Sequence, residues 1–187
     1  MALSWESYHE LTNLMVSVHK HFNAGEWDEM GRIFEDARLT TLYPWHDQAL
    51  VSEGGPHIGE AYRRATRLYE GLPRVQYTLT NVLLDGNEDQ GVARSWSQYF
   101  AMFGDETTWK QAHGILPESH PTAPIHIFVA GRYEDYFERV DGRWRYRSRT
   151  CHADFTGDRS VHLASDPLQD RVVSYLADRA EVGSGPQ

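Results

Sequence analysis

The chain has 187 residues, of which 40% are hydrophobic and 24% charged, and its formal net charge is −9. This length predicts a single domain over residues 1–182, followed by a disordered tail at 183–187. The acidic surplus argues against nucleic-acid and anionic-membrane partners, because both bind basic surfaces.

The N-terminal part of the chain carries three helix patterns. Ser4 is suited to cap a first helix, whose apolar residues recur at helical spacing until Gly25 ends it. Residues 27–34 predict a second, short helix. After a predicted turn at 54–56, residues 58–70 return to a helical pattern.

Strand patterns dominate the rest of the chain. They fall at residues 38–43, 75–84 and 92–103, with a turn at 85–88, and continue in a hairpin that opens at Ile125. Asp141-Gly142 is a strong signal for the tight turn of that hairpin. A loop at 104–124 and a last helix at 166–179 complete the pattern. This order predicts an α+β fold: a cone-shaped barrel of a strongly bent antiparallel sheet, closed by N-terminal helices, with an extra C-terminal helix.

Cys151 is the single cysteine, so no intrachain disulfide can form and a reducing compartment is favoured. The N-terminus does not read as a signal peptide, and no apolar run approaches the ~20 residues of a membrane span. We therefore expect a cytoplasmic protein with no membrane partner.

Two motifs, FNAGEWDEM at residues 22–30 and GRYEDYFERVDGRW at residues 131–144, together with the order of the elements, resemble the nuclear transport factor 2-like superfamily. The sequence is most similar to its SnoaL-like members, which include polyketide cyclases, scytalone-type dehydratases, dehydrochlorinases and ketosteroid-isomerase relatives. The resemblance covers roughly residues 8 to 160. It implies a hollow cone that binds a small molecule.

The resemblance places two residues at the positions of the catalytic dyad of the family's dehydratases. Asn23 stands where those enzymes carry an aspartate, and Tyr77 stands where they carry a histidine. Neither side chain is a base at neutral pH, which argues against the simple dehydratase mechanism. His19 precedes Asn23 by four residues and shares its helical face, so it becomes the candidate base.

Other positions also match the family's pocket. Tyr43 falls near the tyrosine that activates a carbonyl or water, and Tyr133 falls where an asparagine lines the pocket. Arg149 matches an arginine that assists departure of the leaving group. Asp135 belongs to the Tyr-x-Asp pattern. The alternative for the tyrosines is plain packing of the sheet, and for Arg149 and Asp135 it is a salt bridge that stabilises the sheet.

Further residues are candidates for substrate contacts. Trp45 and Trp96 would line an apolar pocket with Phe103, His46 follows the first strand at the cone mouth, and His113 lies in the loop that could cover the cavity. Packing or surface exposure is the alternative for each of them.

The ten histidines match no metal-ligand spacing, and the sequence carries no nucleotide-binding motif. We therefore expect neither a metal nor a cofactor.

The leading hypothesis is a cofactor-independent acid–base enzyme that acts on a small hydrophobic, oxygenated metabolite of secondary metabolism. The reaction would be cyclisation, isomerisation, dehydration or epoxide opening, carried out by a homodimer or homotrimer. Tyr43 and Tyr77 would be acid or electrophile. The rival is a non-catalytic subunit resembling the β subunit of ring-hydroxylating oxygenases, to which the segment 157–163 is similar, or a ligand-binding protein without turnover.

Overall fold

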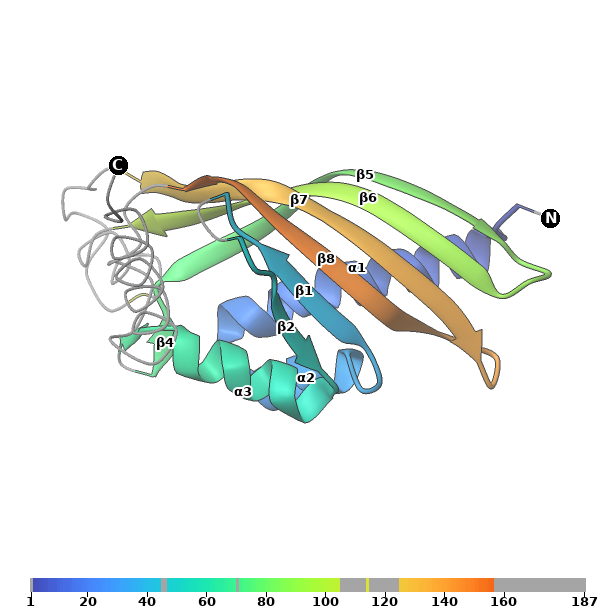
Figure 1. The fold of residues 1–187 in the computed structure, drawn as a ribbon, viewed down its shortest axis with the longest axis horizontal. Coiled ribbons are helices and arrows are strands. Elements are labelled where there is room, and N and C mark those ends of the chain that lie inside the picture. The colour runs from blue at the N-terminus through green and yellow to red at the C-terminus, as the bar shows by residue number, and fades with distance from the viewer. Residues whose placement is uncertain (1, 45–46, 70, 105–113, 115–124, 157–187) are drawn as a thin grey trace, which may run out of the picture.

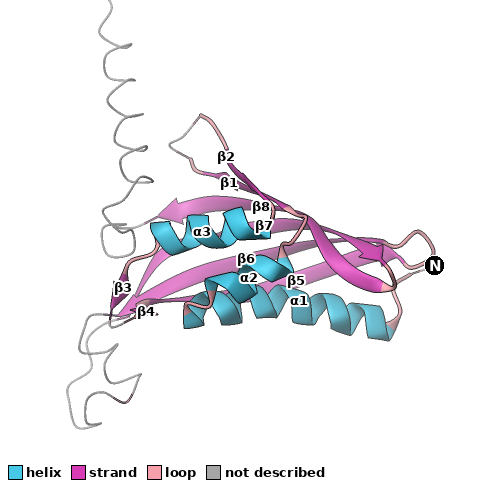
Figure 2. Ribbon diagram, turned by 90° about the horizontal axis from the view of Figure 1, so that it is seen from below, coloured by secondary structure: helices cyan, strands magenta, loops and turns pink. Residues whose placement is uncertain are grey.

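The computed structural model describes residues 2–44, 47–69, 71–104, 114 and 125–156. In these residues, three helices lie on one face of a six-stranded sheet (Figures 1 and 2). The helices are α1 (Trp5–Ala24), α2 (Trp27–Ile33) and α3 (Gly55–Ala65). The strands of the sheet are β1 (Arg38–Leu42), β2 (Leu50–Glu53), β5 (Val75–Asn87), β6 (Val92–Gly104), β7 (Ile125–Val140) and β8 (Arg143–Thr156). A small separate ribbon pairs β3 (Leu68–Tyr69) with β4 (Leu72–Pro73). The predicted α+β class is confirmed.

The sheet has the order β2-β1-β8-β7-β6-β5, so the described strands leave two open edges and form a curved sheet rather than a closed barrel. The prediction of a purely antiparallel sheet is wrong in one place. β1 runs parallel to β8, from the pair Arg38–Ser148 to the pair Leu42–His152, and the long connection that parallel pairing requires is present, because α3 and several strands lie between them in the chain. The register shifts within the β5–β6, β6–β7 and β7–β8 pairs, and such irregularities bend a sheet.

The first helix follows its predicted signals. The Ser4 side chain accepts a hydrogen bond from the backbone N–H of Ser7 at 3.1 Å, and Gly25 ends the helix with a φ of 72°. The residues that α1 buries recur at helical spacing: Ser7, Leu11, Met15, Val18, His19 and Phe22. This stripe packs α1 onto the inner face of the sheet, where it forms much of the core.

Two predicted elements have wrong boundaries, and one strand of the sheet was missed. The helix predicted at 58–70 is α3, which begins earlier because Gly54 caps it and Pro56 fits its first turn, and which ends earlier, at Ala65, before the strand β3. The strand β2 was not predicted. The turn predicted at 85–88 lies at 88–91 instead, because β5 keeps pairing with β6 as far as Asn87. The Asn87 side chain then accepts hydrogen bonds from the backbone N–H groups of the next turn.

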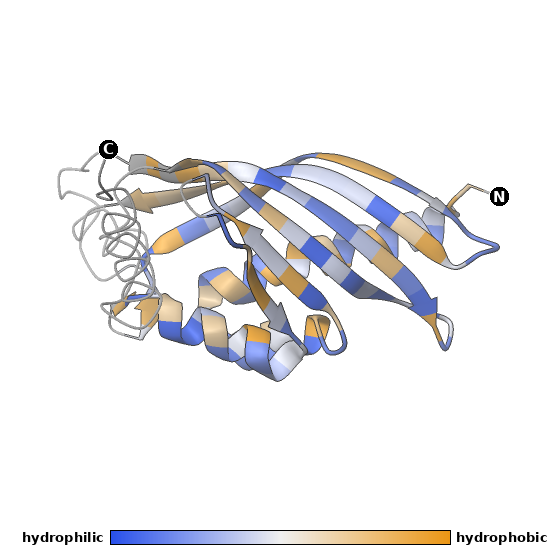
Figure 3. Ribbon diagram, in the orientation of Figure 1, coloured by the Kyte–Doolittle hydropathy of each residue, from blue (hydrophilic) through white to orange (hydrophobic). Residues whose placement is uncertain are grey.

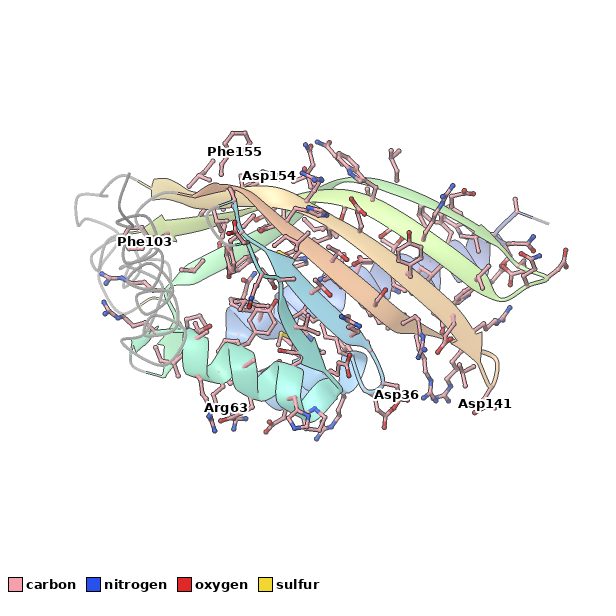
Figure 4. The ribbon with its side chains drawn as sticks, viewed as in Figure 1. Asp36, Arg63, Phe103, Asp141, Asp154 and Phe155 are labelled. Carbon is pink, nitrogen blue, oxygen red and sulfur yellow. The ribbon has the colours of Figure 1, made fainter. Side chains whose placement is uncertain are left out.

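The C-terminal hairpin confirms its predicted turn, since Asp141 and Gly142 have φ values of 50° and 77°. Along the long strands hydrophilic and hydrophobic residues alternate (Figure 3). The inner face packs on the helices, whereas the outer face is exposed. Phe155, at the end of β8, projects away from the helices and is 74% exposed (Figure 4).

The predictions of a helix at 166–179, a tail at 183–187 and a loop over most of 104–124 concern residues outside the described part of the chain.

Candidate active site

The motif Gly-x-Tyr-x-Asp places three side-chain positions on the inner face of β7. Because successive strand residues alternate between faces, Gly131, Tyr133 and Asp135 all point toward the helices. A methyl group at Gly131 would lie 2.9 Å from Tyr99 Cε1 and 1.9 Å from the carbonyl oxygen of His152. Because Gly131 has no side chain, the Tyr99 ring can extend from β6 over β7 toward β8. Its hydroxyl reaches Cys151 Sγ on β8 at 3.3 Å.

Tyrosines gather on this inner face. The Tyr99 and Tyr133 rings stack at 4.2 Å between centroids, and Tyr77 lies 6.0 Å from Tyr99. We call six residues the interior tyrosine cluster: Tyr43, Tyr62, Tyr77, Tyr99, Tyr133 and Tyr146. Burial raises the pKa of Tyr77 and of Tyr133 well above the ordinary value. These phenols therefore stay protonated and are able to donate hydrogen bonds.

His19 projects from α1 into this cluster. Its ring lies 5.5 Å from the ring of Tyr133 and 6.4 Å from that of Tyr77, and the residue is only 6% exposed. Burial, and then the charge of Arg149, lower the pKa of His19 to about 3. The imidazole is therefore neutral at physiological pH. Its Nε2 atom has no hydrogen-bond partner among the described residues.

A buried ion pair joins the two C-terminal strands beside the cluster. Arg149 donates from Nε to Asp135 Oδ1 at 2.7 Å and from Nη2 to Asp135 Oδ2 at 2.9 Å. Nη2 also donates to the Tyr146 hydroxyl at 2.8 Å, and Ser95 donates to Asp135 at 3.2 Å. Burial opposes the charge of Arg149, but the carboxylate of Asp135 holds its pKa well above the ordinary value. The salt-bridge alternative from the sequence is confirmed in its geometry.

Asn23 and Tyr77, the two residues at the family's dyad positions, are in direct contact through the backbone. The Asn23 amide donates to the Tyr77 carbonyl oxygen at 3.0 Å and accepts from the Tyr77 N–H at 2.8 Å. This bidentate contact ties the end of α1 to the start of β5. Asn23 therefore positions Tyr77, and its polar atoms face the peptide backbone rather than the phenol.

A family model described as a SnoaL-like domain matches residues 4–150, which include all the elements that build this site except the last residues of β8. The chain belongs to the SnoaL-like family. Among solved structures, this SnoaL-like protein is similar to Aln2 from a Streptomyces species, with 14% identity, a TM-score of 0.58, and coverage of 81% of this chain and 93% of that chain.

Two structures from Novosphingobium aromaticivorans also share the fold. One is a candidate scytalone dehydratase, with 17% identity, a TM-score of 0.55, and coverage of 81% of this chain and 86% of that chain. The other is the β subunit of a candidate aromatic-ring-hydroxylating dioxygenase, with 12% identity, a TM-score of 0.57, and coverage of 80% and 90%. At these identities the likeness shows the nuclear transport factor 2-like fold alone. No curated protein matches the sequence significantly.

The predicted site residues of this SnoaL-like protein divide into four groups, and the last of these is Trp96 alone. His19, Tyr77, Tyr133, Asp135 and Arg149 come together on the inner face, and half-buried Tyr43 packs against the same cluster at the end of β1. Asn23 contacts the cluster only through the backbone of Tyr77. The positions predicted at 45, 46 and 113 lie outside the described residues.

The prediction that Trp96 lines the interior pocket is wrong. Trp96 alternates with the inward-facing Ser95 and Ser97, so it points to the outer face and is 36% exposed. There it lines a hollow of about 490 Å³ together with Leu83 and Tyr136, on the side of the sheet opposite the interior tyrosine cluster.

Sequence reasoning missed several inward-facing residues: Tyr62, Ser95, Ser97, Tyr99 and Tyr146. The period of a strand already places Ser95, Ser97 and Tyr99 on one face of β6 and Trp96 on the other, but only the structure shows which face is inside. Tyr62 follows Ile58 by four residues on α3, which places both on one helical face.

The described residues hold no group of three or more His, Cys, Asp or Glu placed to bind a metal ion. The expectation of a metal-free protein stays a prediction. None of the helices in the described ranges is long and apolar enough to span a membrane.

Proposed function

We propose that this SnoaL-like protein is a cofactor-independent acid–base enzyme for a small, hydrophobic, oxygenated metabolite of secondary metabolism. The reaction is a cyclisation, isomerisation, dehydration or epoxide opening. The observation that carries the proposal is the buried, neutral imidazole of His19, which lies near the rings of both Tyr77 and Tyr133 and has a ring nitrogen left unpartnered by the described residues.

The roles follow from the protonation states. His19 is unprotonated and has a free lone pair for a proton from substrate or water, and Tyr77 keeps a proton that it can donate to an oxygen. Burial makes the imidazole a weak base and the phenol a weak acid, so both transfers require that bound substrate bring the two pKa values closer to the working pH. A dehydration would pair these steps, because one group removes a proton while the other protonates the departing hydroxyl. Tyr43, which lies near enough to Tyr77 to affect its pKa, is the second candidate donor.

The remaining residues support this pair. Asn23 holds the backbone of Tyr77, so that the phenol keeps one position relative to α1. The charge of Arg149, which lies against the Tyr133 ring, is already matched by Asp135, so charge that develops on a substrate oxygen nearby would be stabilised by the phenol donors. Asp135 fixes the orientation of Arg149 with two hydrogen bonds.

Tyr77→Phe tests the proposal, because it removes one hydroxyl and keeps the ring that packs against Phe22. We expect turnover to fall by roughly 100-fold or more while the fold loses about 1 kcal/mol. The assay follows turnover of a panel of hydroxylated, epoxidised and enolisable aromatic compounds. Tyr136→Phe, which removes an exposed hydroxyl from the outer face, is the matched control and should leave the rate unchanged.

Wild-type rates in a folded Tyr77→Phe protein would exclude Tyr77 as the acid. Absence of turnover across the whole panel would favour the non-catalytic subunit or the ligand-binding protein.

The homodimer or homotrimer expected from the sequence belongs to the same proposal. The outer face exposes Leu83, Trp96 and Tyr136 and also carries the ion pair of Arg94 with Asp85, so it offers apolar area and both signs of charge to a second copy. Sedimentation equilibrium of wild type and Trp96→Glu tests it, since the substitution should shift the protein toward monomer. A monomeric wild type would contradict this part of the proposal.

A further inference from the structure

Ser97, on β6, has the most buried hydroxyl without a partner on the inner face of the described sheet. The residue is 0% exposed, and its Oγ has no hydrogen-bond partner among the described residues. Leaving a buried hydroxyl unpaired is costly, and native proteins rarely retain one without a reason. By contrast, the neighbouring inward-facing Ser95 donates its hydroxyl to Asp135.

Ser97 and His19, the residues that carry the two unpartnered atoms, are both neighbours of Tyr133. Ser97 is the direct cross-strand partner of Tyr133, so the Cβ atoms of the two residues are about 5 Å apart on the same face. His19 packs on the Tyr133 ring from the helix side. Both residues are more than nine-tenths buried beside Tyr133, and neither Ser97 Oγ nor His19 Nε2 has a partner in the described part of the chain.

We propose that Ser97 Oγ and His19 Nε2 form a binding subsite for a neutral oxygen, the hydroxyl or keto group of an uncharged aromatic ligand. A serine hydroxyl both donates and accepts, and an imidazole nitrogen does one or the other according to its tautomer. Together they satisfy a ligand hydroxyl, which donates to one and accepts from the other, or a keto oxygen, which accepts from both.

The charges around the subsite select a neutral ligand. The positive charge of Arg149 is already matched by two hydrogen bonds to Asp135. The phenols of Tyr77 and Tyr133 keep their protons. A charged ligand would therefore enter without a counter-charge, which is strongly unfavourable in a buried site. The stacked rings of Tyr99 and Tyr133 favour a flat aromatic body.

The subsite rests on the proposed function for its place in the molecule, but its test reads binding rather than turnover. The probes are 2-naphthol and naphthalene, which share a body and differ by one hydroxyl, measured by equilibrium dialysis. Wild type should bind 2-naphthol more tightly than naphthalene. Ser97→Ala should lose about 5- to 10-fold in affinity for 2-naphthol and keep its affinity for naphthalene.

Thermal melts without a probe give the matched structural control. Ser97→Ala should melt at the wild-type temperature or higher, because the described residues offer its hydroxyl no hydrogen bond to lose. Ser95→Ala should melt lower, since it removes a hydrogen bond to Asp135.

Three results would overturn the subsite: no binding of 2-naphthol to wild type, equal loss or no loss of both probes in Ser97→Ala, or a Ser97→Ala melt well below wild type. Unchanged binding of both probes would mean that water alone occupies the position, and equal loss of both would mean that the substitution disturbs the packing. Loss of the 2-naphthol preference in Ser97→Ala upholds the subsite even where Tyr77→Phe leaves turnover unchanged, so the two proposals can fail separately.

Discussion

The guanidinium carbon of Arg149 lies 4.2 Å from the ring centroid of Tyr133, and the stack of Tyr99 on Tyr133 is equally close. A cation against an aromatic face is attracted by the electrons of the ring. This contact lowers the pKa of Tyr133, whereas burial raises it, and burial wins. The buried charge of Arg149 is therefore stabilised by the aromatic rings that it contacts and by the carboxylate of Asp135. The phenols beside it keep their protons.

Arg149→Met should cost about 3–5 kcal/mol of unfolding free energy, because it leaves the Asp135 carboxylate buried without its partner. The double variant Arg149→Met with Asp135→Leu should recover a large part of this loss. Urea denaturation measures both. Arg132→Met, which breaks a half-exposed pair with Asp154, is the control and should cost under about 1 kcal/mol. If Arg149→Met and Arg132→Met lose equal unfolding free energy, the buried pair contributes no more than the half-exposed one, which would contradict this prediction.

Asn23→Ala should cost about 1–3 kcal/mol, since it leaves the N–H and carbonyl of Tyr77 without their side-chain partner. Asn23→Asp should also destabilise, because a carboxylate cannot donate to the Tyr77 carbonyl oxygen. The exposed Asn13→Ala on the same helix is the control and should be neutral or slightly stabilising. If Asn23→Asp proves as stable as wild type, the amide does not tether α1 to β5.

The stability of the protein should fall as the pH drops from 6.5 toward 3. The folded-state pKa of His19, about 3, lies below the unfolded value of 6.5, so the unfolded chain binds the extra proton in this window. The contribution of His19 is therefore complete above pH 6.5 and decreases by about 1.4 kcal/mol for each pH unit below it.

Urea denaturation at several pH values between about 4 and 7.5 measures this slope. His19→Gln should flatten the slope relative to wild type, while the exposed His9→Gln should not. Parallel curves for wild type and His19→Gln would mean that His19 binds a proton as readily in the folded protein as in the unfolded chain.

Gly131→Ala should destabilise the fold by more than the ~1–3 kcal/mol usual for overpacking, because the new methyl group meets backbone as well as a side chain. The carbonyl of His152 must move, and the ring of Tyr99 with it. Adding Tyr99→Ala should not rescue the variant, because the backbone clash remains. Thermal melts of the single and double variants provide the measurement, and full rescue by Tyr99→Ala would show that the ring alone requires the glycine.

Local patterns in the sequence determined much of the fold. The Ser4 cap, the apolar stripe of α1 and the Asp141-Gly142 turn each depend on residues within a few positions of one another, so their outcome could be predicted. The motif from Gly131 to Asp135 also carried enough alternation to place Tyr133 and Asp135 on one face. The family followed from such motifs, and with it the α+β cone.

Only the tertiary structure decided which partners those residues meet. The parallel pairing of β1 with β8 and the extension of β5 to Asn87 depend on strands distant in the sequence. Asn23 is engaged by the backbone of Tyr77 and Trp96 faces outward because of strand register, which motif alignment does not contain. No sequence pattern marks the atoms of His19 and Ser97 that the described residues leave unpartnered, because hydrogen bonding is satisfied by contact in space and not by position along the chain.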